Sequence, residues 1–556
     1  MVSRRNFLKS SILAAAPLAA HNAATQDIPE KPLPGTLTLA DYHKAVAELR
    51  KAIGDRWVFT DDETELRTYR DVYSTTPDEA HMPAAAVAPR TVEEIQAILR
   101  IARDYRIPLW TISTGKNYAY GGPAPMKPGY FVLDLNRMKR IIEVNEEHGY
   151  AVVEPGVSYF DLYNYLQRRG SKLWIDPAAP GWGSVLGNLS EHGAGYTPYG
   201  DHLLMNCGMQ VVLADGTVVD TGMGALSGAA TSSLYKYGCG PWVEGMFTQS
   251  NFGIITKVGI WLMPEPPGYR PYLVTFPKEE DLYQITEVVG PLRLNMLIPN
   301  AATTVGLIWE AAPRVTRKQY YTGTGPMPMR HRRKMAQDLN IGMWNFYGAL
   351  YGPEPIMDNN WKVLEEAFRS IPGARFFFEG DRPGDPAWRY RVKLMSGVPN
   401  MTEFSLMNWV GSGAHIDFSP RSPVTGEDSM RQFTLIRDRA NEYGFDYIGE
   451  FLVGWRELLN IFQLVFDRLN DDERRRAHEC FGHLVNDFAE HGYGEYRTHL
   501  DFMDQIAGTY NWNDGALWKL HHRLKQALDP VGILSPGKSG IWPAPQDKIL
   551  SADYAD

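Results

Sequence analysis

The chain has 556 residues, 44% of them apolar and 12% aromatic, and a net charge of −9. This length exceeds the size at which one hydrophobic core stops growing, so two large domains are expected. The negative charge argues against nucleic acid or an anionic membrane as a partner and suits a basic protein. Cys207, Cys239 and Cys480 lack metal-binding spacing, which argues against a zinc site, an iron–sulfur cluster or a disulfide framework and leaves room for one disulfide at most.

The first 26 residues have the pattern of an export signal. Arg4 and Arg5 are followed by Phe-Leu-Lys and by the moderately apolar run SSILAAAPLAA, which is too short to span a bilayer as a permanent anchor. This order resembles a twin-arginine signal, whose route carries folded proteins. It predicts a periplasmic protein whose mature chain starts near Ala24 to Gln26, and it favours a tightly held cofactor. No later stretch is predicted to insert into a membrane.

From about Leu39 to Pro266, segments with helical periodicity alternate with short β-rich runs. TVEEIQAILRIARDY is amphipathic, PLWTIST and YFVLDL have the composition of strands, and GYAVVEPGVSYFDLYNYLQRRG predicts a strand, a turn and a helix. Glycine-rich turns lie at Gly115 to Gly122 and at Gly181 to Gly195. These patterns predict an α+β or α/β architecture.

A proline-rich break, Pro-Glu-Pro-Pro-Gly at 264–268, marks the expected domain boundary. A strand, YLVTF, and a charged helix follow it. The second domain is expected to run to about Tyr493, with several strands and with long helices such as DSMRQFTLIRDRANEYG and DERRRAHECFGHLVNDFAEHG. The last segment, which begins near Ala516, is predicted to form a helix and a loop.

The turn that begins at Ser113, with the sequence STGKNYAYGGPAP, is a candidate nucleotide-binding loop. Its glycines would let backbone amides approach a pyrophosphate, and no Rossmann GxGxxG or Walker lysine–serine pair points to a commoner nucleotide fold. The stretch GWGSVLGN at 181–188 has the same character. Glycine-rich turns are most often simply turns, so neither stretch is specific alone.

A series of ordered motifs carries a resemblance across the whole mature chain. The chain resembles the vanillyl-alcohol oxidase and p-cresol methylhydroxylase family of FAD enzymes. The resemblance implies an α+β fold with a two-part FAD-binding domain, residues 27–268 and 500–556, and an inserted α+β cap domain, residues 269–499. The motifs are GGPAP, YFDLYNYL, GYTPYGDH, TGMGAL, GMFTQSNFGIITK, GIWLMP, WNFYGALYGPEPI, TEFSLMNW, GAHIDFSP, GEYRTHLDFMDQ and PGKSGIWP.

The resemblance also implies which residues hold FAD. They come from the two glycine-rich turns, from the FGIITK motif and from PGKSGIWP. The expected FAD-binding residues are Ser113, Thr114, Gly115, Lys116, Asn117, Ser184, Gly187, Asn188, Gly253, Ile255 and Lys538.

Carried over residue by residue, the family's phenolate site falls on Tyr120, Tyr196 and Arg497, with Tyr496 beside it. An arginine among neutral phenols suits an oxyanion, because it supplies a cation and donors without a repelling charge. A phenol has a pKa near 10, so binding it ionised at pH 7 requires a shift of about 3 units, or about 4 kcal/mol. Once ionised, the ring favours hydride departure from the benzylic carbon.

His415 aligns with the histidine that carries the covalent 8α-flavin bond in the oxidase branch, so the resemblance implies attachment there. The methylhydroxylase branch uses a tyrosine four residues after the glutamate that matches Glu403, which belongs to the expected site. Met407 stands at that place, which argues against tyrosyl attachment. No convincing equivalent exists for the histidine that promotes attachment in the oxidase branch, since the candidate, His81, is in the wrong register.

The residue expected to act as general base also differs from that of the oxidase branch. The position that holds an aspartate in that branch is Ala179 here. Two other carboxylates stand in apolar, β-rich sequence, where burial is costly unless the group is paired or used. Glu450 is the expected base, at a position where the methylhydroxylase branch also has glutamate. Asp417 is the second candidate, and a purely structural role for either residue stays open.

The expected reaction is hydride transfer from the benzylic carbon of a para-alkylphenol, such as 4-ethylphenol, propylphenol or a eugenol-like compound, to FAD. Water would then add to the p-quinone methide. Glu450, the export signal and the acidic surface favour a small c-type cytochrome as electron acceptor; the chain has no CxxCH haem motif of its own.

Two other readings remain. His415 favours an oxidase that reduces dioxygen to hydrogen peroxide. A non-catalytic protein that binds aromatic compounds is the alternative from another class, and loss of yellow colour with 4-ethylphenol would exclude it. The family resemblance further implies a homodimer.

Overall fold

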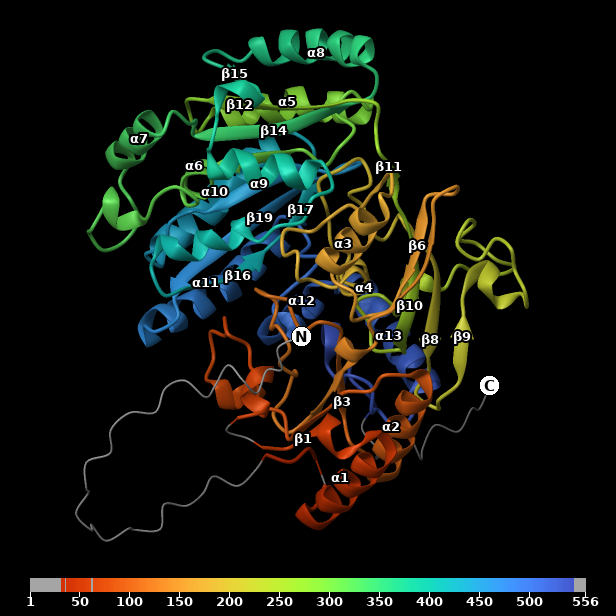
Figure 1. The fold of residues 1–556 in the computed structure, drawn as a ribbon. Coiled ribbons are helices and arrows are strands. Elements are labelled where there is room, and N and C mark those ends of the chain that lie inside the picture. Colours follow the sequence, from red (N-terminus) through yellow and green to blue (C-terminus); the bar gives the residue numbers. More distant parts are fainter. Residues whose placement is uncertain (1–31, 36, 62–63, 545–556) are drawn as a thin grey trace, which may run out of the picture.

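The computed structural model describes residues 32–35, 37–61 and 64–544, so the export-signal prediction lies outside the described residues. Two smaller sheets with their helices form the N-terminal part of the molecule, and one large sheet with its own helices forms the cap (Figure 1). The mixture of helices and largely antiparallel sheets confirms the predicted α+β class.

The first sheet lies at the bottom of Figure 1 and is covered by two helices. Its strand order is β1-β2-β4-β3, with β2, β4 and β3 parallel. Apolar residues of α2 recur with helical spacing and are buried against this sheet, as the periodicity predicts. The elements are α1 (Leu39–Ile53), β1 (Val58–Phe59), β2 (Ala85–Val87), α2 (Val92–Tyr105), β3 (Leu109–Ile112) and β4 (Phe131–Asp134).

The second sheet is antiparallel, with the order β5-β6-β10-β8-β9. Helix α3 packs on it and begins with a capping box, in which the Ser158 and Asp161 side chains each accept from the other's backbone amide. The elements are β5 (Ile141–Asn145), β6 (Tyr150–Val153), α3 (Tyr159–Arg169), α4 (Val185–Ser190), β8 (Asn206–Val212), β9 (Val218–Asp220) and β10 (Ile254–Trp261). A short pair, β7 (Leu173–Trp174) and β11 (Met263–Pro264), leads to the cap.

The cap contains an antiparallel sheet of eight strands in the order β15-β12-β14-β13-β18-β19-β16, with β17 also paired to β19. Its buried aromatic and aliphatic residues form the largest core of the molecule. The strands are β12 (Tyr269–Phe276), β13 (Thr303–Gly306), β14 (Trp344–Tyr351), β15 (Arg375–Phe377), β16 (Gly413–Phe418), β17 (Arg421–Pro423), β18 (Gly449–Val453) and β19 (Glu457–Asp467).

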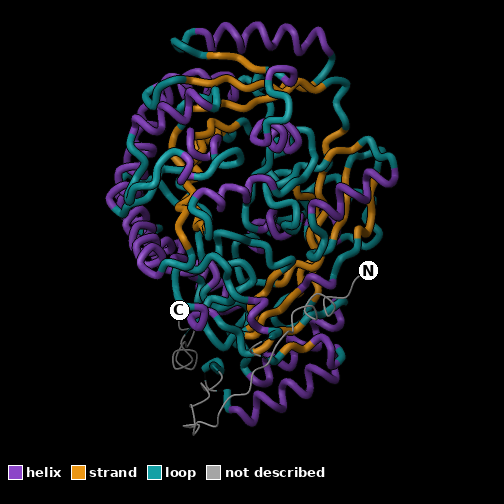
Figure 2. The backbone as a smooth tube through the Cα atoms, turned by 60° about the vertical axis from the view of Figure 1, so that its left-hand side comes forward, coloured by secondary structure: helices purple, strands orange, loops and turns teal. Residues whose placement is uncertain are grey.

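Most of the cap helices lie along this large sheet (Figure 2), whereas α9 packs against Tyr196, on the side of the sheet that meets the N-terminal part. The two long helices predicted from periodicity form as α10 and α11 and pack against β19. The cap helices are α5 (Asp281–Leu294), α6 (Leu307–Ala311), α7 (Met329–Asp338), α8 (Glu354–Arg369), α9 (Pro386–Met395), α10 (Gly426–Glu442) and α11 (Asp471–Glu490).

After the cap the chain returns to the N-terminal part through α12 (Met503–Thr509) and α13 (Trp512–Leu528). Its return is fixed at β3, where the Leu109 amide donates to the Ile533 carbonyl and the Ser535 amide donates to the Leu109 carbonyl, both at 2.7 Å. The expected two-part domain with an inserted cap is therefore present, whereas the predicted boundary residues themselves stay predictions.

Among the described residues all three cysteines are free thiols, with Cys207 and Cys480 buried and Cys239 exposed. The helices in this part of the chain are all too short or too polar to cross a membrane.

Candidate functional site

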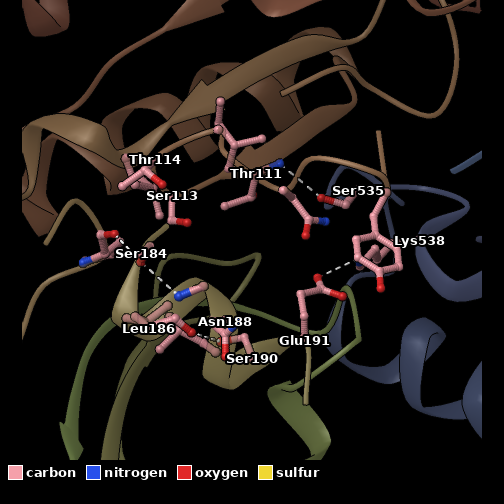
Figure 3. Close-up of a pocket in the computed structure, with 18 of the residues that line it drawn as sticks. Thr111, Ser113, Thr114, Ser184, Leu186, Asn188, Ser190, Glu191, Ser535 and Lys538 are labelled. Atoms are coloured by element: carbon pink, nitrogen blue, oxygen red, sulfur yellow. Dashed lines mark hydrogen bonds and ion pairs between the residues drawn. The ribbon is translucent and has the colours of Figure 1, made fainter. Parts of the chain in front are cut away.

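Two cavities adjoin each other: the first lies within the N-terminal part, and the second lies between that part and the cap sheet. The first has a volume of about 180 Å³. Figure 3 shows its walls: Ser113 and Thr114 follow β3 on one side, α4 and its flanking residues lie opposite, and Ser535 and Lys538 close a third side. The expected FAD-binding residues that line it are Ser113, Thr114, Gly115, Lys116, Asn117, Ser184, Gly187, Asn188, Gly253, Ile255 and Lys538. The fold thus brings together predicted residues from four distant segments of the chain.

Two glycines have specific reasons to be in these walls. Gly115 has φ +65°, a left-handed conformation that favours glycine and turns the chain after β3. Gly187 lies so close to the opposite turn that an added Cβ would stand 2.4 Å from the Ser113 Oγ. A larger residue at this position would require the Ser113 side chain to move.

The donor set of this cavity fits a dinucleotide. Hydroxyl and amide side chains from Ser113, Thr114 and Asn188 suit a diphosphate, and the amine of Lys538 is held at 2.7 Å from Glu191. Two buried polar atoms that line it, Ser250 Oγ and Arg497 Nε, have no hydrogen-bond partner within the described part of the chain. Buried polar groups are normally satisfied, so these atoms indicate a ligand.

The second cavity has a volume of about 120 Å³ and shares Lys116, Asn117, Tyr120, Asn188 and Arg497 with the first. It is lined by His415 and by every residue predicted to be catalytic, together with Ala179. The predicted catalytic residues are Tyr120, Tyr196, Glu403, Asp417, Glu450, Tyr496 and Arg497.

The cap sheet supplies one wall of this cavity. His415 and Asp417 are two residues apart in β16 and so face the same side. Glu450 in β18 pairs with Ile461 in β19, and directly paired residues also share a face. Strand alternation thus gathers these side chains into the cavity, although they come from three strands.

Arg497 holds the opposite wall, beside Tyr120. Its guanidinium carbon lies 4.0 Å from the centroid of the Tyr120 ring, and its Nη2 donates to Asn117 Oδ1 at 2.5 Å. Burial lowers the pKa of Arg497, but Tyr120 and other neighbours raise it, and the net shift is upward. Burial and the charge of Asp417 raise the pKa of Tyr120 well above its usual value. The site therefore presents a fixed cation beside a neutral phenol.

The segment that carries Tyr496 and Arg497 is anchored by its neighbour Glu495. The Ser419 amide donates to Glu495 Oε2 at 2.7 Å, and the Arg421 amide donates to the Gly494 carbonyl at 3.0 Å. Burial raises the pKa of Glu495 well above its usual range. Glu495 thus serves to fix the backbone from which the two site residues project.

Tyr196 lines the same cavity, and its hydroxyl forms a hydrogen bond with Glu403. The Tyr196 hydroxyl donates to Glu403 Oε2 at 3.4 Å, and its backbone amide donates to Asp176 Oδ1 at 3.0 Å. Sequence reasoning overlooked Asp176, which fixes the Tyr196 loop. The structure thus places Tyr196 on the carboxylate side of the cavity, whereas the prediction had grouped it with the arginine.

Glu450 is buried and Glu403 is half-buried, and the charge of each carboxylate acts on the other across the cavity. Burial, opposed in part by the charge of Arg391, raises the pKa of Glu403 to about 7. Burial and the proximity of Glu403 raise the pKa of Glu450 to about 8. Because two neighbouring carboxylates cannot easily both ionise, one of them keeps a proton near neutral pH. This arrangement can hold a water molecule and accept its proton.

The raised pKa values predict a pH-dependent stability. The folded protein retains protons that the unfolded chain has released above pH 4.5, so the contribution of this pair is full at low pH and is lost as the pH rises through 7 and 8. Glu450→Gln should therefore be more stable than the parent at pH 9, by about 5 kcal/mol for a pKa raised from 4.5 to about 8, and the difference should close toward pH 5. Calorimetry across this range measures it. Glu147→Gln, at an exposed position, is the control, and a gap that is constant with pH would contradict the carboxylate pair.

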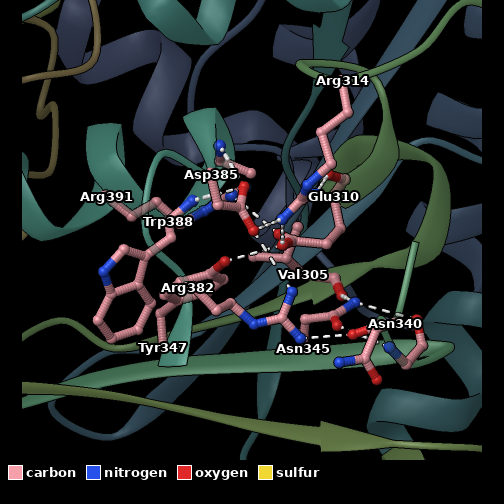
Figure 4. Close-up of polar contacts among 12 residues, drawn as sticks. Val305, Glu310, Arg314, Asn340, Asn345, Tyr347, Arg382, Asp385, Trp388 and Arg391 are labelled. Carbon is pink, nitrogen blue, oxygen red and sulfur yellow. Dashed lines mark hydrogen bonds and ion pairs between the residues drawn. The ribbon is translucent and has the colours of Figure 1, made fainter. Parts of the chain in front are cut away.

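Arg391 is a functional residue that sequence reasoning missed. It is 2% exposed, and its Nη1 donates to Glu310 Oε2 at 3.0 Å. Figure 4 shows that Glu310 also accepts from Arg314 and Tyr347, which places one carboxylate between two arginines. The guanidinium charge of Arg391 opposes the effect of burial on the pKa of Glu403 and of Glu450, whereas the charge of Glu310 adds to the rise in the pKa of Glu450. No motif marked Arg391 in the sequence.

Removal of Arg391 should destabilise the cap, because the buried Glu310 carboxylate would lose one of the two arginines that balance its negative charge. We expect Arg391→Met to lower the free energy of unfolding by about 3 kcal/mol. Chemical denaturation of the variant against the parent measures this loss. Arg391→Met combined with Glu310→Gln should recover part of the stability, and a single variant as stable as the parent would show that the buried pair contributes nothing.

The histidine and aspartate of β16 are in contact, with His415 Nδ1 at 2.7 Å from Asp417 Oδ1. His415 Nε2 is buried and has no hydrogen-bond partner among the described residues. His81, the weak candidate for a promoting histidine, is engaged elsewhere: its Nε2 lies 2.7 Å from Asp501 and its Nδ1 lies 3.0 Å from the Pro125 carbonyl. Met407 lines the cavity as an apolar residue.

Comparison with known proteins agrees with this geometry. Residues 83–222 match the model of an FAD binding domain, and residues 301–539 match that of the FAD linked oxidases, C-terminal domain. The chain is 40% identical over 511 residues to the 4-cresol dehydrogenase [hydroxylating] flavoprotein subunit of Pseudomonas putida, which covers 92% of this chain and 97% of that protein.

Two solved structures are similar over nearly their whole length. The 4-ethylphenol oxidase of Gulosibacter chungangensis, in complex with isoeugenol, is 40% identical with a TM-score of 0.90, covering 92% of this chain and 99% of that one. A p-cresol methylhydroxylase with substrate bound is 39% identical, also with a TM-score of 0.90, covering 94% and 100%. The fold, the FAD-type cavity and these likenesses show that the chain belongs to the vanillyl-alcohol oxidase and p-cresol methylhydroxylase family of FAD-dependent oxidoreductases.

Proposed function

We propose that the protein dehydrogenates para-alkylphenols and adds water to the benzylic carbon. One observation carries this proposal: a cavity with Arg497 and Tyr120 at one wall and two proton-binding carboxylates at another adjoins the cavity that fits FAD. The similarity to proteins named for 4-cresol and 4-ethylphenol supports the substrate class.

The first half of the reaction depends on the cationic wall. Arg497 binds the substrate oxygen as a phenolate, because the guanidinium charge favours the ionised form and its planar donors match an oxyanion. Tyr120 adds a neutral donor, since its raised pKa keeps the proton on its hydroxyl. When bound, FAD supplies the acceptor for the hydride that leaves the benzylic carbon. Electron release from the phenolate turns the substrate into a p-quinone methide.

The second half depends on the carboxylates. Glu450, in its ionised form, removes a proton from water as the oxygen bonds to the electrophilic carbon. Glu403, whose pKa is raised only to about 7, ionises before Glu450 and accepts a hydrogen bond from the Tyr196 hydroxyl. Ala179 lines the cavity without a charge, so the base lies on the cap sheet and not on the loop before α4. This placement decides the side of the substrate from which water attacks.

The electron acceptor we propose is a small c-type cytochrome, which suits the acidic chain and the similarity to a dehydrogenase subunit. Dioxygen is the second candidate, favoured by His415 in the cavity and by the likeness to a 4-ethylphenol oxidase. We also propose covalent attachment of FAD at His415, periplasmic export guided by Arg4 and Arg5, and assembly as a homodimer.

One experiment separates the two acceptors. The enzyme is reduced anaerobically with 4-ethylphenol, and its reoxidation is then followed after mixing with air-saturated buffer or with oxidised cytochrome c. We expect faster reoxidation by the cytochrome. Rapid reoxidation by dioxygen with stoichiometric hydrogen peroxide would make the protein an oxidase, and failure of 4-ethylphenol to reduce the enzyme would overturn the substrate class.

A further inference from the structure

His415 has one free ring nitrogen and one engaged ring nitrogen. Nδ1 is held by Asp417 at 2.7 Å, and both side chains belong to β16 and face the cavity. Nε2 is buried and has no partner among the described residues. The ring is also confined by aromatic neighbours, with centroids of Tyr73 at 5.1 Å and Phe404 at 6.2 Å. The imidazole therefore has a defined orientation before any ligand arrives.

From this geometry we infer that Asp417 is a positioning residue that prepares His415 Nε2 to form the bond to FAD. A carboxylate accepts hydrogen bonds, so the proton of a neutral imidazole must sit on Nδ1 and leave the lone pair on Nε2. Second-shell carboxylates fix ligand histidines in metal sites by the same means. The inference rests on the proposed attachment at His415 and adds the group that promotes it.

The Nε2 lone pair forms a carbon–nitrogen bond to the 8α carbon, one carbon–hydrogen bond there breaks, and its proton leaves to solvent. The electron pair of that bond stays with the flavin, and dioxygen accepts the two electrons and two protons as hydrogen peroxide. During bond formation the imidazole becomes cationic while Nδ1 keeps its proton. The negative charge of Asp417 stabilises this cation as well as the starting tautomer.

Asp417 has the promoting role for which no suitable histidine was found in the sequence. His81 lies in a separate cluster, bound to Asp501, while His499 contacts both Asp501 and Asp71. Among the described residues, no hydrogen bond joins that cluster to His415. Asp417 contacts His415 because residues two apart in a strand lie on the same face.

The test follows covalent attachment directly. Full-length protein prepared without FAD is mixed with FAD in air, and the covalent fraction is measured over time by denaturing gel fluorescence and by peptide mass. We expect Asp417→Leu, which has a similar branched shape but no acceptor, to slow attachment at least 100-fold. Asp417→Asn, which keeps an acceptor oxygen without the charge, should slow it about 10-fold. Tight non-covalent binding of FAD by both variants shows that they are folded.

Two controls and a second readout make the outcome decisive. Glu147→Gln removes an exposed carboxylate and should leave the attachment rate within about twofold, whereas His415→Ala should give none. The flavin peptide from the parent, examined by NMR, should carry the bond at Nε2. Attachment at Nδ1, or parent-like rates in both Asp417 variants, would overturn the role of Asp417. A parent protein that holds FAD only non-covalently would overturn the attachment itself, while reduction by 4-ethylphenol would still test the proposed reaction.

Discussion

Arg497→Ala should slow reduction of the enzyme by 4-ethylphenol about 10³-fold at pH 7. The reason is the cost of ionising a phenol at neutral pH, about 4 kcal/mol, which the guanidinium in the cavity wall is positioned to offset. Without that charge, reduction should require a pH close to the ordinary pKa of the substrate, near 10. Anaerobic stopped-flow absorbance between pH 6 and pH 10 measures both effects.

Two further variants sharpen this result. Arg497→Lys keeps the charge but loses the planar pair of donors, so it should recover part of the rate. Arg421 is a matched control, because its guanidinium carbon lies 4.3 Å from the Tyr496 ring but it does not line the cavity. Arg421→Ala should stay within a few-fold of the parent. A pH profile of Arg497→Ala that coincides with the parent's would remove the phenolate argument.

Glu450→Gln should separate the two halves of the reaction. We expect reduction of the enzyme to keep its rate within about threefold, while addition of water slows about 100-fold, which is within the range of general base catalysis. The quinone methide from 4-ethylphenol would then lose a proton from its methyl group instead, so 4-vinylphenol should replace the alcohol as the main product. Chromatography of the products and stopped-flow reduction measure the two steps separately.

The pH dependence of the parent gives an independent check. Only the ionised form of Glu450 can take a proton from water, and its pKa is raised to about 8 by burial and by Glu403. The ratio of alcohol to 4-vinylphenol should therefore rise as the pH increases through 8, and the Glu450→Gln ratio should stay flat. Equal losses in reduction and hydration would argue instead for a general structural role.

Local patterns were sufficient for much of the fold. The apolar spacing of α2 and the charged faces of α10 and α11 predict helices, and each forms because its apolar face is buried against a sheet. The motifs around Tyr120, Arg497 and His415 likewise predicted residues that meet in one cavity, although they are far apart in the chain.

Other parts of the site could not be found in this way, because they depend on tertiary contacts between segments without distinctive motifs. Arg391 stands in an ordinary helix, α9, and matters only because the fold buries it beside Glu310. Asp176 holds the Tyr196 loop and the Tyr196 hydroxyl donates to Glu403, two contacts that no motif indicates. The His415–Asp417 contact was accessible in principle, since residues two apart in a strand share a face.

The most direct test of the central claim compares two substrates that differ only in whether they can ionise. The enzyme is mixed anaerobically with 4-ethylphenol or with its O-methyl ether, 4-ethylanisole, and flavin absorbance is followed. Binding as a phenolate at Arg497, followed by hydride transfer, predicts rapid bleaching with the phenol and none with the ether. Equal bleaching by both compounds, or none by either, would contradict it.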